Sequence, residues 1–91
     1  MSAATSNLIN LRVLFFAKTR DLSGLNEAKI EVENNLQVLE LLDKICVTFN
    51  LNIIKSSVIL AINEQYCDDL SERLQLKEGD EVAVIPPISG G

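Results

Sequence analysis

The sequence contains no histidine, and its two cysteines, Cys46 and Cys67, are too far apart to form a CxxC pair. A zinc site built from cysteine and histidine is therefore excluded for this chain alone, as is a cysteine–histidine nucleophile. We expect both cysteines to be buried thiols in a reducing compartment. Neither has a basic sequence neighbour that would lower its pKa, so neither is favoured as a reactive group.

The chain also lacks clustered positive charge and long hydrophobic segments. Eight lysines and arginines against thirteen acidic residues give a net charge of -5, which disfavours nucleic acid as a ligand. An apolar run such as Val13 to Ala17 is far too short to span a bilayer. Residues 1–7 resemble neither a signal peptide nor a transit peptide, so we expect a flexible N-terminal segment and a cytosolic protein that binds no membrane.

Hydrophobic residues make up 47% of the 91 residues, which is enough to form the core of one small globular domain. Alternation predicts a first strand over Leu8 to Phe16, buried on both faces toward its end. Residues 17–25 carry charged and turn-forming side chains and read as a turn. A second, half-exposed strand is predicted over Asn26 to Glu33, and it should pair with the first.

One amphipathic helix is predicted over Gln37 to Phe49, where apolar residues recur at helical spacing. Asn34 and Asn35 precede it and are expected to cap its first turn. Glu40 lies four residues before Lys44, the favourable order for an ion pair on a helix surface.

The C-terminal half predicts three more strands. These are a buried strand over Val58 to Ile62, a short edge strand over Gln65 to Cys67 and a last strand over Glu81 to Ile85. Between them, the leucines at positions 70, 74 and 76 indicate a brief helical or irregular crossing. The predicted order β-β-α-β-β-β is typical of an α+β protein of the β-grasp, or ubiquitin-like, class: a mixed sheet of about five strands that grips one main helix.

The chain ends on the segment PPISGG, which follows the last predicted strand directly. Pro86 and Pro87 lack amide donors, so the ladder stops and the chain leaves the domain in an extended form. Gly90 and Gly91 have no Cβ and make the narrowest terminus that a polypeptide can form. The five residues from Pro87 to Gly91 reach about 16 Å when extended. Such a tail suits entry into another protein's active site, where its carboxylate would need activation before acyl chemistry.

Two segments, LFFAKTRDLSG over residues 14–24 and GDEVAVIPPISGG over residues 79–91, closely resemble the small subunit of molybdopterin synthase. The resemblance covers Leu8 to Gly91. It implies a sulfur carrier whose terminal Gly91 is adenylated and converted to a thiocarboxylate, which donates sulfur to cyclic pyranopterin monophosphate to form the molybdopterin dithiolene. The inserted tail would comprise Pro86, Pro87, Ile88, Ser89 and Gly90.

The same resemblance implies two partners. One is an adenylyltransferase and sulfurtransferase similar to ubiquitin-activating enzymes, which uses ATP with Mg. The other is the synthase large subunit, in a heterotetramer of two small and two large subunits. The catalytic bases would lie in the large subunit, so this chain is expected to have no active site of its own and no permanently bound cofactor or metal.

The candidate contacts with the large subunit are Phe16, Ile59 and Leu60, because an apolar side chain that faces outward from a sheet marks a partner surface. Phe15 and Phe16 point to opposite faces, so at least one of them should be core. We expect a β-grasp domain over residues 8–87 and a flexible reactive tail over 88–91. A similar tail would also serve tRNA thiolation, thiazole synthesis or a ubiquitin-like protein modifier, and an interaction module with an inert tail is a further alternative.

Overall fold

The structure is a computed structural model that describes residues 8–86. Its helices are α1 (Lys18–Ser23), α2 (Val38–Thr48) and the 3-10 helix η2 (Asn52–Ser57). Its strands are β1 (Leu8–Phe15), β2 (Glu27–Glu33), β3 (Asn35–Gln37), β4 (Ile59–Ile62), β5 (Gln65–Cys67), β6 (Arg73–Gln75) and β7 (Glu81–Ile85). No helix in the described part of the chain has the length and apolar character needed to cross a membrane.

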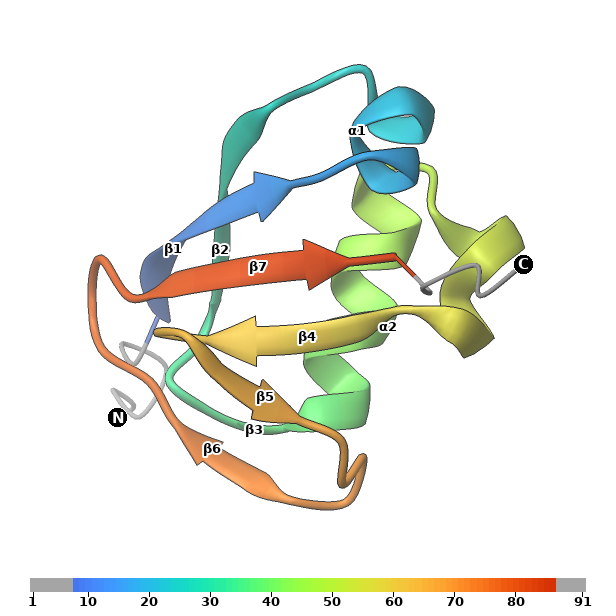
Figure 1. Ribbon diagram of the computed structural model, residues 1–91. Coiled ribbons are helices and arrows are strands. Elements are labelled where there is room, and N and C mark those ends of the chain that lie inside the picture. The colour runs from blue at the N-terminus through green and yellow to red at the C-terminus, as the bar shows by residue number, and fades with distance from the viewer. Residues whose placement is uncertain (1–7, 87–91) are drawn as a thin grey trace.

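Five strands form one mixed sheet in the order β2-β1-β7-β4-β5 (Figure 1). The last strand, β7, lies in the middle, parallel to β1 and antiparallel to β4. The β4–β5 connection is a two-residue turn in which Asn63 and Glu64 both have positive φ, as a tight hairpin requires. The predicted mixed five-stranded sheet with a late central strand is confirmed.

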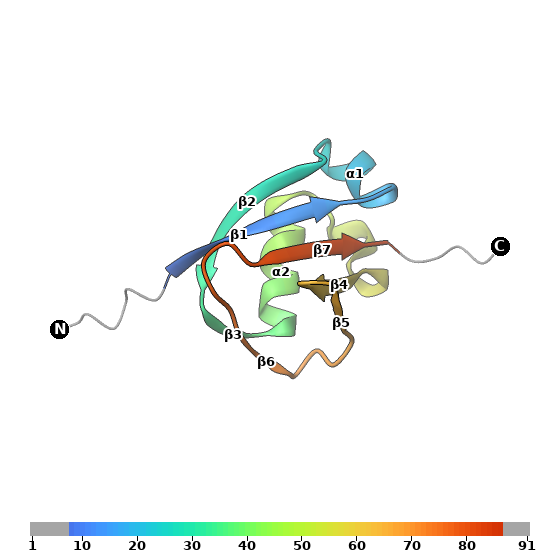
Figure 2. The same ribbon diagram turned by 60° about the vertical axis from the view of Figure 1, so that its left-hand side comes forward.

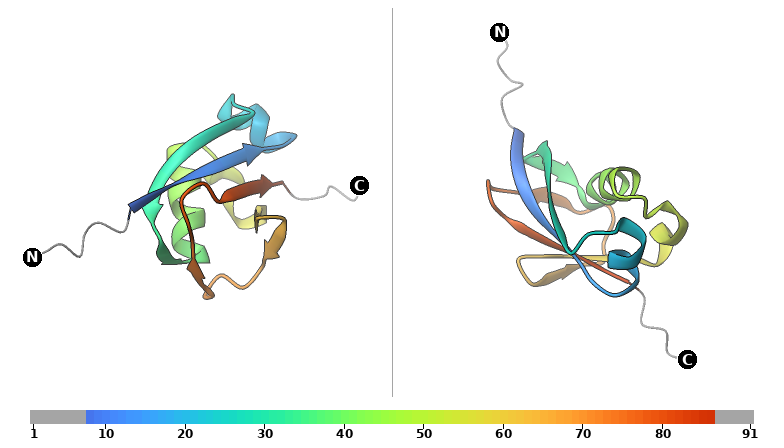
Figure 3. Two further views of the ribbon diagram at one scale, coloured as in Figure 1. Left: turned by 90° about the vertical axis from the view of Figure 1, so that its left-hand side faces the viewer. Right: turned by 90° about the horizontal axis from the view of Figure 1, so that it is seen from above.

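Helix α2 covers one face of this sheet, which we call the inner face (Figures 2 and 3). Alternate residues of β1 and β7 point toward it, and Leu11, Val13, Val82 and Val84 are at most 1% exposed. From α2, the side chains of Leu41, Leu42, Ile45 and Cys46 complete the core. Burial of each large aliphatic side chain contributes about 1.5–3 kcal/mol, so this interface supplies most of the stability.

The predicted helix is correct to within a residue at each end, but its predicted caps are wrong. Asn35 belongs to β3, and the N-cap is Gln37, whose backbone N–H donates to Glu40 Oε1 at 2.8 Å in a capping box. The carbonyls of Glu72 and Leu70 accept from the amides of Val38 and Leu39. The first turn is therefore capped both by this local capping box and by carbonyls far away in the sequence.

Two short segments differ from the sequence prediction. Residues 18–23, predicted as part of a turn, form α1, which is too short to show helical periodicity. The crossing over residues 70–76 contains β6, which pairs with β3 in a second, two-stranded sheet. Each of these strands has three residues, and only their pairing across the fold identifies them as strands.

The outer face of the sheet, on the side away from α2, corrects one further expectation. The end of β1 was predicted to be buried on both faces, yet Leu14 is only partly buried and Phe16 is 46% exposed. The reason is that α2 covers the inner face alone, as Figure 3 shows. Apolar side chains consequently remain accessible on the outer face.

Candidate functional site

The root of the tail lies at the end of the central strand. Strand β7 ends at Ile85, and Pro86, the last described residue, is partly buried beside it. Ile85 pairs with Ile59 of β4, and on the other side Val84 lies opposite Phe15 of β1. The predicted tail residues Pro87, Ile88, Ser89 and Gly90 and the reactive Gly91 lie outside the described residues.

Around this root the outer face of the sheet is apolar. One row of cross-strand neighbours runs from Leu14 through Ala83 and Ala61 to Tyr66. Two residues closer to the tail, Ile85 pairs with Ile59, and Phe16 follows directly after the end of β1. We call this surface the outer patch, comprising Leu14, Phe16, Ile59, Ala61, Tyr66, Ala83 and Ile85. Phe16, Ile59 and Tyr66 are 46%, 41% and 71% exposed, whereas Ala61 is 5% exposed, so the patch offers apolar area mainly through these three large side chains.

The opposite half of the same face is charged. Arg12 on β1 forms ion pairs with Glu27 on β2, at 3.0 Å, and with Glu81 on β7, at 3.4 Å. The hydrogen bond from Arg12 lowers the pKa of Glu27, and in return Glu27 raises the pKa of Arg12. Lys29 and Glu31 continue this exposed surface along β2. The two halves meet across the centre of the sheet.

The structure separates the three predicted contact residues. Phe16 and Ile59 face outward within the outer patch, on either side of Ile85. Leu60 is a correction: it is 1% exposed and belongs to the core, because successive residues of a strand point to opposite faces. Leu60 therefore supports the patch from below and is not available for contact.

Five residues of the patch were missed by sequence reasoning: Leu14, Ala61, Tyr66, Ala83 and Ile85. Tyr66 gave a usable signal, since it is an aromatic residue at the centre of a predicted edge strand and alternates with Gln65 and Cys67. The other four residues gave no such signal in the sequence. Their place beside Phe16 and Ile59 depends on how β7 pairs with β1 and with β4.

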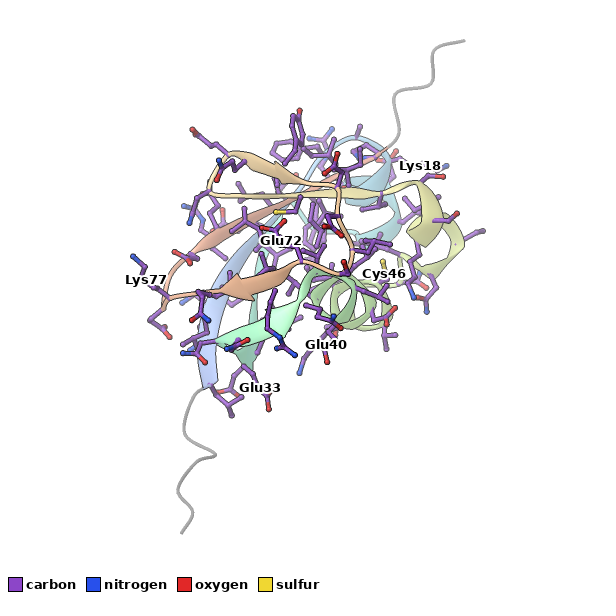
Figure 4. The ribbon with its side chains drawn as sticks, turned by 90° about the horizontal axis from the view of Figure 1, so that it is seen from below. Lys18, Glu33, Glu40, Cys46, Glu72 and Lys77 are labelled. Atoms are coloured by element: carbon purple, nitrogen blue, oxygen red, sulfur yellow. The ribbon has the colours of Figure 1, made fainter. Side chains whose placement is uncertain are left out.

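Both cysteines lie in the core, as predicted. Cys46 is fully buried on the inner side of α2, and Cys67 is 9% exposed. Burial raises the pKa of each thiol, which keeps both protonated and poorly nucleophilic. In Figure 4, Cys46 lies between α2 and the sheet, whereas Lys18, Glu33 and Lys77 lie at the periphery of the domain. The thiols are therefore unsuited to carry sulfur.

The outer patch is suited to binding a partner protein, but it has few side chains that could take part in a chemical reaction. Tyr66 is its one ionisable side chain. Within residues 8–86, no three histidine, cysteine, aspartate or glutamate side chains gather as a metal site. Apolar surface around a strand end from which a narrow tail departs is suited to docking a partner that receives the tail.

A mixed five-stranded sheet packed on one helix, with its last strand in the centre, defines a β-grasp protein of the ubiquitin-like class. The fold matches the ubiquitin-like domain of an Arabidopsis thaliana protein with a TM-score of 0.73 at 22% identity, covering 99% of this chain and 88% of that one. It also matches a chain in the complex of subunits 1 and 2 of molybdopterin-converting factor from Helicobacter pylori, with a TM-score of 0.63 at 24% identity, covering 91% and 100%. The predicted fold class is confirmed.

The sequence pattern of the ThiS family matches residues 13–91, and this chain belongs to that family. Proteins named molybdopterin synthase sulfur carrier subunit are similar to this chain over nearly its whole length. The protein of that name from Anopheles gambiae is 48% identical over 90 residues, covering 97% of this chain and 99% of the relative. The one from Drosophila melanogaster is 47% identical over 88 residues, covering 97% and 98%. The family expected from the two end segments is confirmed.

Proposed function

We propose that this chain is the sulfur carrier of a molybdopterin synthase and that its reactive group is the carboxylate of Gly91. The near-full-length identity of 48% to a molybdopterin synthase sulfur carrier subunit is the observation that carries this proposal. The ThiS family match supports it because it extends through Gly91 and so includes the whole tail.

The chemistry begins with a carboxylate that is a poor electrophile, because resonance spreads its charge. Attack of a Gly91 oxygen on the α-phosphorus of ATP releases pyrophosphate and leaves an acyl-adenylate. A sulfide equivalent then attacks the acyl carbon and expels AMP, which leaves the thiocarboxylate. ATP and Mg belong to the activating enzyme in this scheme, and the carrier holds no cofactor of its own.

The outer patch then docks the carrier while the tail enters the partner's active site. The Helicobacter pylori complex supports this step, since it pairs subunits 1 and 2 of molybdopterin-converting factor. From the patch, the segment from Pro87 to Gly91 can reach about 16 Å into the partner. Two carriers, one at each end of a dimer of large subunits, would supply the two sulfurs of the dithiolene made from cyclic pyranopterin monophosphate.

The carrier is proposed to work in the cytosol. Its cysteines are free thiols, which suits a reducing compartment.

Intact-mass analysis tests the proposal. After incubation with the activating enzyme, ATP, Mg and a sulfur donor, the chain should show one oxygen replaced by sulfur at its terminus. A variant extended by one alanine after Gly91 is the matched control: it should keep its fold and gain no sulfur. An unchanged mass of the wild type, or sulfur uptake by the extended variant, would contradict the proposal. A ladder of protein conjugates dependent on Gly91 would instead indicate a protein modifier.

A further inference from the structure

Thr19 is the one buried polar side chain that residues 8–86 contain, with an exposure of 0%. It lies in α1, directly after the turn that ends β1. A hydroxyl removed from water needs hydrogen-bond partners inside the protein. The hydrogen-bond partners of the Thr19 hydroxyl indicate its structural role.

The hydroxyl contacts Phe16, which directly follows β1, and Val84 on β7. The backbone N–H of Phe16 donates to Thr19 Oγ1 at 2.9 Å, and Oγ1 lies 2.9 Å from the carbonyl oxygen of Val84. The carbonyl oxygen of Phe16 is a second acceptor at 2.9 Å. Because a hydroxyl has one proton, it accepts from Phe16 and donates to one of these carbonyls at a time.

The register of the parallel pair shows what this contact replaces. Arg12 N–H donates to the carbonyl of Asp80, and donors and acceptors in a parallel ladder repeat every second residue. Continued by four residues, this ladder would join Phe16 N–H directly to the carbonyl of Val84. Instead, the chain turns away from β7 after Phe15, and the Thr19 hydroxyl stands between the donor and the acceptor.

The turn that places Thr19 there is strained. Ala17 has φ 50° and ψ -119°, a conformation that favours glycine, and the Thr19 amide donates to the carbonyl of Phe16 at 3.0 Å. Strain of this kind persists where the surrounding contacts hold it in place. The contacts of the Thr19 hydroxyl are among those that do so.

We propose that Thr19 is a positioning residue that fixes the direction in which the tail leaves the domain. Val84 lies two residues before Pro86, and Ile85 between them pairs with Ile59 of β4. With the hydroxyl bond, the root of the tail is held from two sides, by β4 through Ile59 and by α1 through Thr19. This role rests on the proposed function, because aiming a tail matters when the tail must enter a partner's active site.

The test compares three variants as substrates of the activating enzyme. Thr19→Val keeps the shape and removes the hydroxyl, Thr19→Ala removes the hydroxyl without branching, and Thr19→Ser keeps it. We expect kcat for thiocarboxylate formation to fall about tenfold in Thr19→Val and Thr19→Ala, with KM little changed because Thr19 is buried and its replacement leaves the exposed surface unaltered. Thr19→Ser should retain a kcat close to that of the wild type.

Two controls separate positioning from loss of stability. Leu74→Ala on β6 removes a core side chain far from the tail and should lower the melting temperature without changing kcat. Hydrogen exchange of the Phe16 amide should be faster in Thr19→Val and Thr19→Ala and remain slow in Thr19→Ser. Equal activity of all three variants, or an equal loss in all three, would overturn the inference.

The experiments distinguish a failure of the proposed function from a failure of the positioning role of Thr19. If the wild type gains no sulfur, the proposed function fails, and amide exchange at Phe16 and Ile85 then decides whether Thr19 holds the tail root. If the wild type gains sulfur and Thr19→Val does so at the same kcat, only the positioning role fails.

Discussion

The two halves of the outer face of the sheet share strands β1 and β7 but differ in the character of their exposed side chains. Near the start of β7, Arg12 bridges Glu27 and Glu81, and exposed charges extend along β2. Near the end of β7, the face carries Phe16, Ile59 and other apolar side chains of the outer patch. One half is suited to water, and the other is suited to a partner.

This difference shows how a small domain can couple docking with delivery. The apolar half surrounds the end of β7, so under the proposed function a partner that covers it would also receive the tail. The charged half limits the size of the exposed apolar surface, which keeps such a domain from associating nonspecifically. Three experiments would break or sharpen this comparison.

The largest effect is expected from Leu60→Ala, compared with Ile59→Ala. The two residues are adjacent, yet Leu60 is 1% exposed and Ile59 is 41% exposed. Removing the buried side chain should cost about 2–5 kcal/mol of stability, since it leaves a cavity in the core. Ile59→Ala should cost less than about 1 kcal/mol. Urea unfolding of both variants measures the difference, and similar losses would show that the assigned faces are wrong.

An intermediate effect is expected in binding. Phe16→Ala should weaken the complex with the large subunit about tenfold or more, because central aromatic side chains dominate interface energies. Lys29→Ala, in the charged half, is the matched control and should change the dissociation constant by less than about threefold.

Isothermal titration calorimetry with each purified variant measures both constants. Since Phe16 and Lys29 are exposed, melting temperatures should stay close to that of the wild type. Equal losses of affinity from the two halves would refute the distinction between them.

The smallest effect is expected from pH acting on the charged half. Arg12 holds the pKa of Glu27 below its ordinary value, so Glu27 stabilises the folded state once it is ionised. That contribution is complete above its unfolded pKa of about 4.3 and is lost as the pH falls through the lower, folded pKa. It should be modest because the pair is exposed and screened by salt.

Glu27→Gln removes this carboxylate and tests the effect. Denaturant unfolding from about pH 6 to about pH 3 should show a shallower loss of stability in the variant than in the wild type. Identical pH dependence of the two proteins would show that the Arg12–Glu27 pair contributes nothing.

Much of the fold was predictable from local pattern. Strand β7 was placed at Glu81–Ile85 and β5 at Gln65–Cys67, because turn residues precede both, a glycine turn in the case of β7 and Asn63 with Glu64 in the case of β5. The limits of α2 followed from helical spacing. The short elements α1, β3 and β6 were not predicted, because three to six residues carry too little periodicity and their stability comes from distant partners.

The candidate site was predictable in part. The exposed Phe16 and Ile59 were named from the sequence, and so was the tail root at Pro86. Leu60 was assigned to the wrong surface, since a continuous apolar run does not reveal which of its residues face out. Thr19 gave no signal, because its importance lies in the point where β1 separates from β7.

The sequence by itself determined the class of fold, the family and the narrow terminus, because alternation, helical spacing and terminal chemistry are local properties of the chain. Only the tertiary structure decided which apolar residues form one surface and what holds the root of the tail. Those features depend on the order of strands in the sheet, which joins residues from both ends of the sequence through hydrogen bonds that no local pattern specifies.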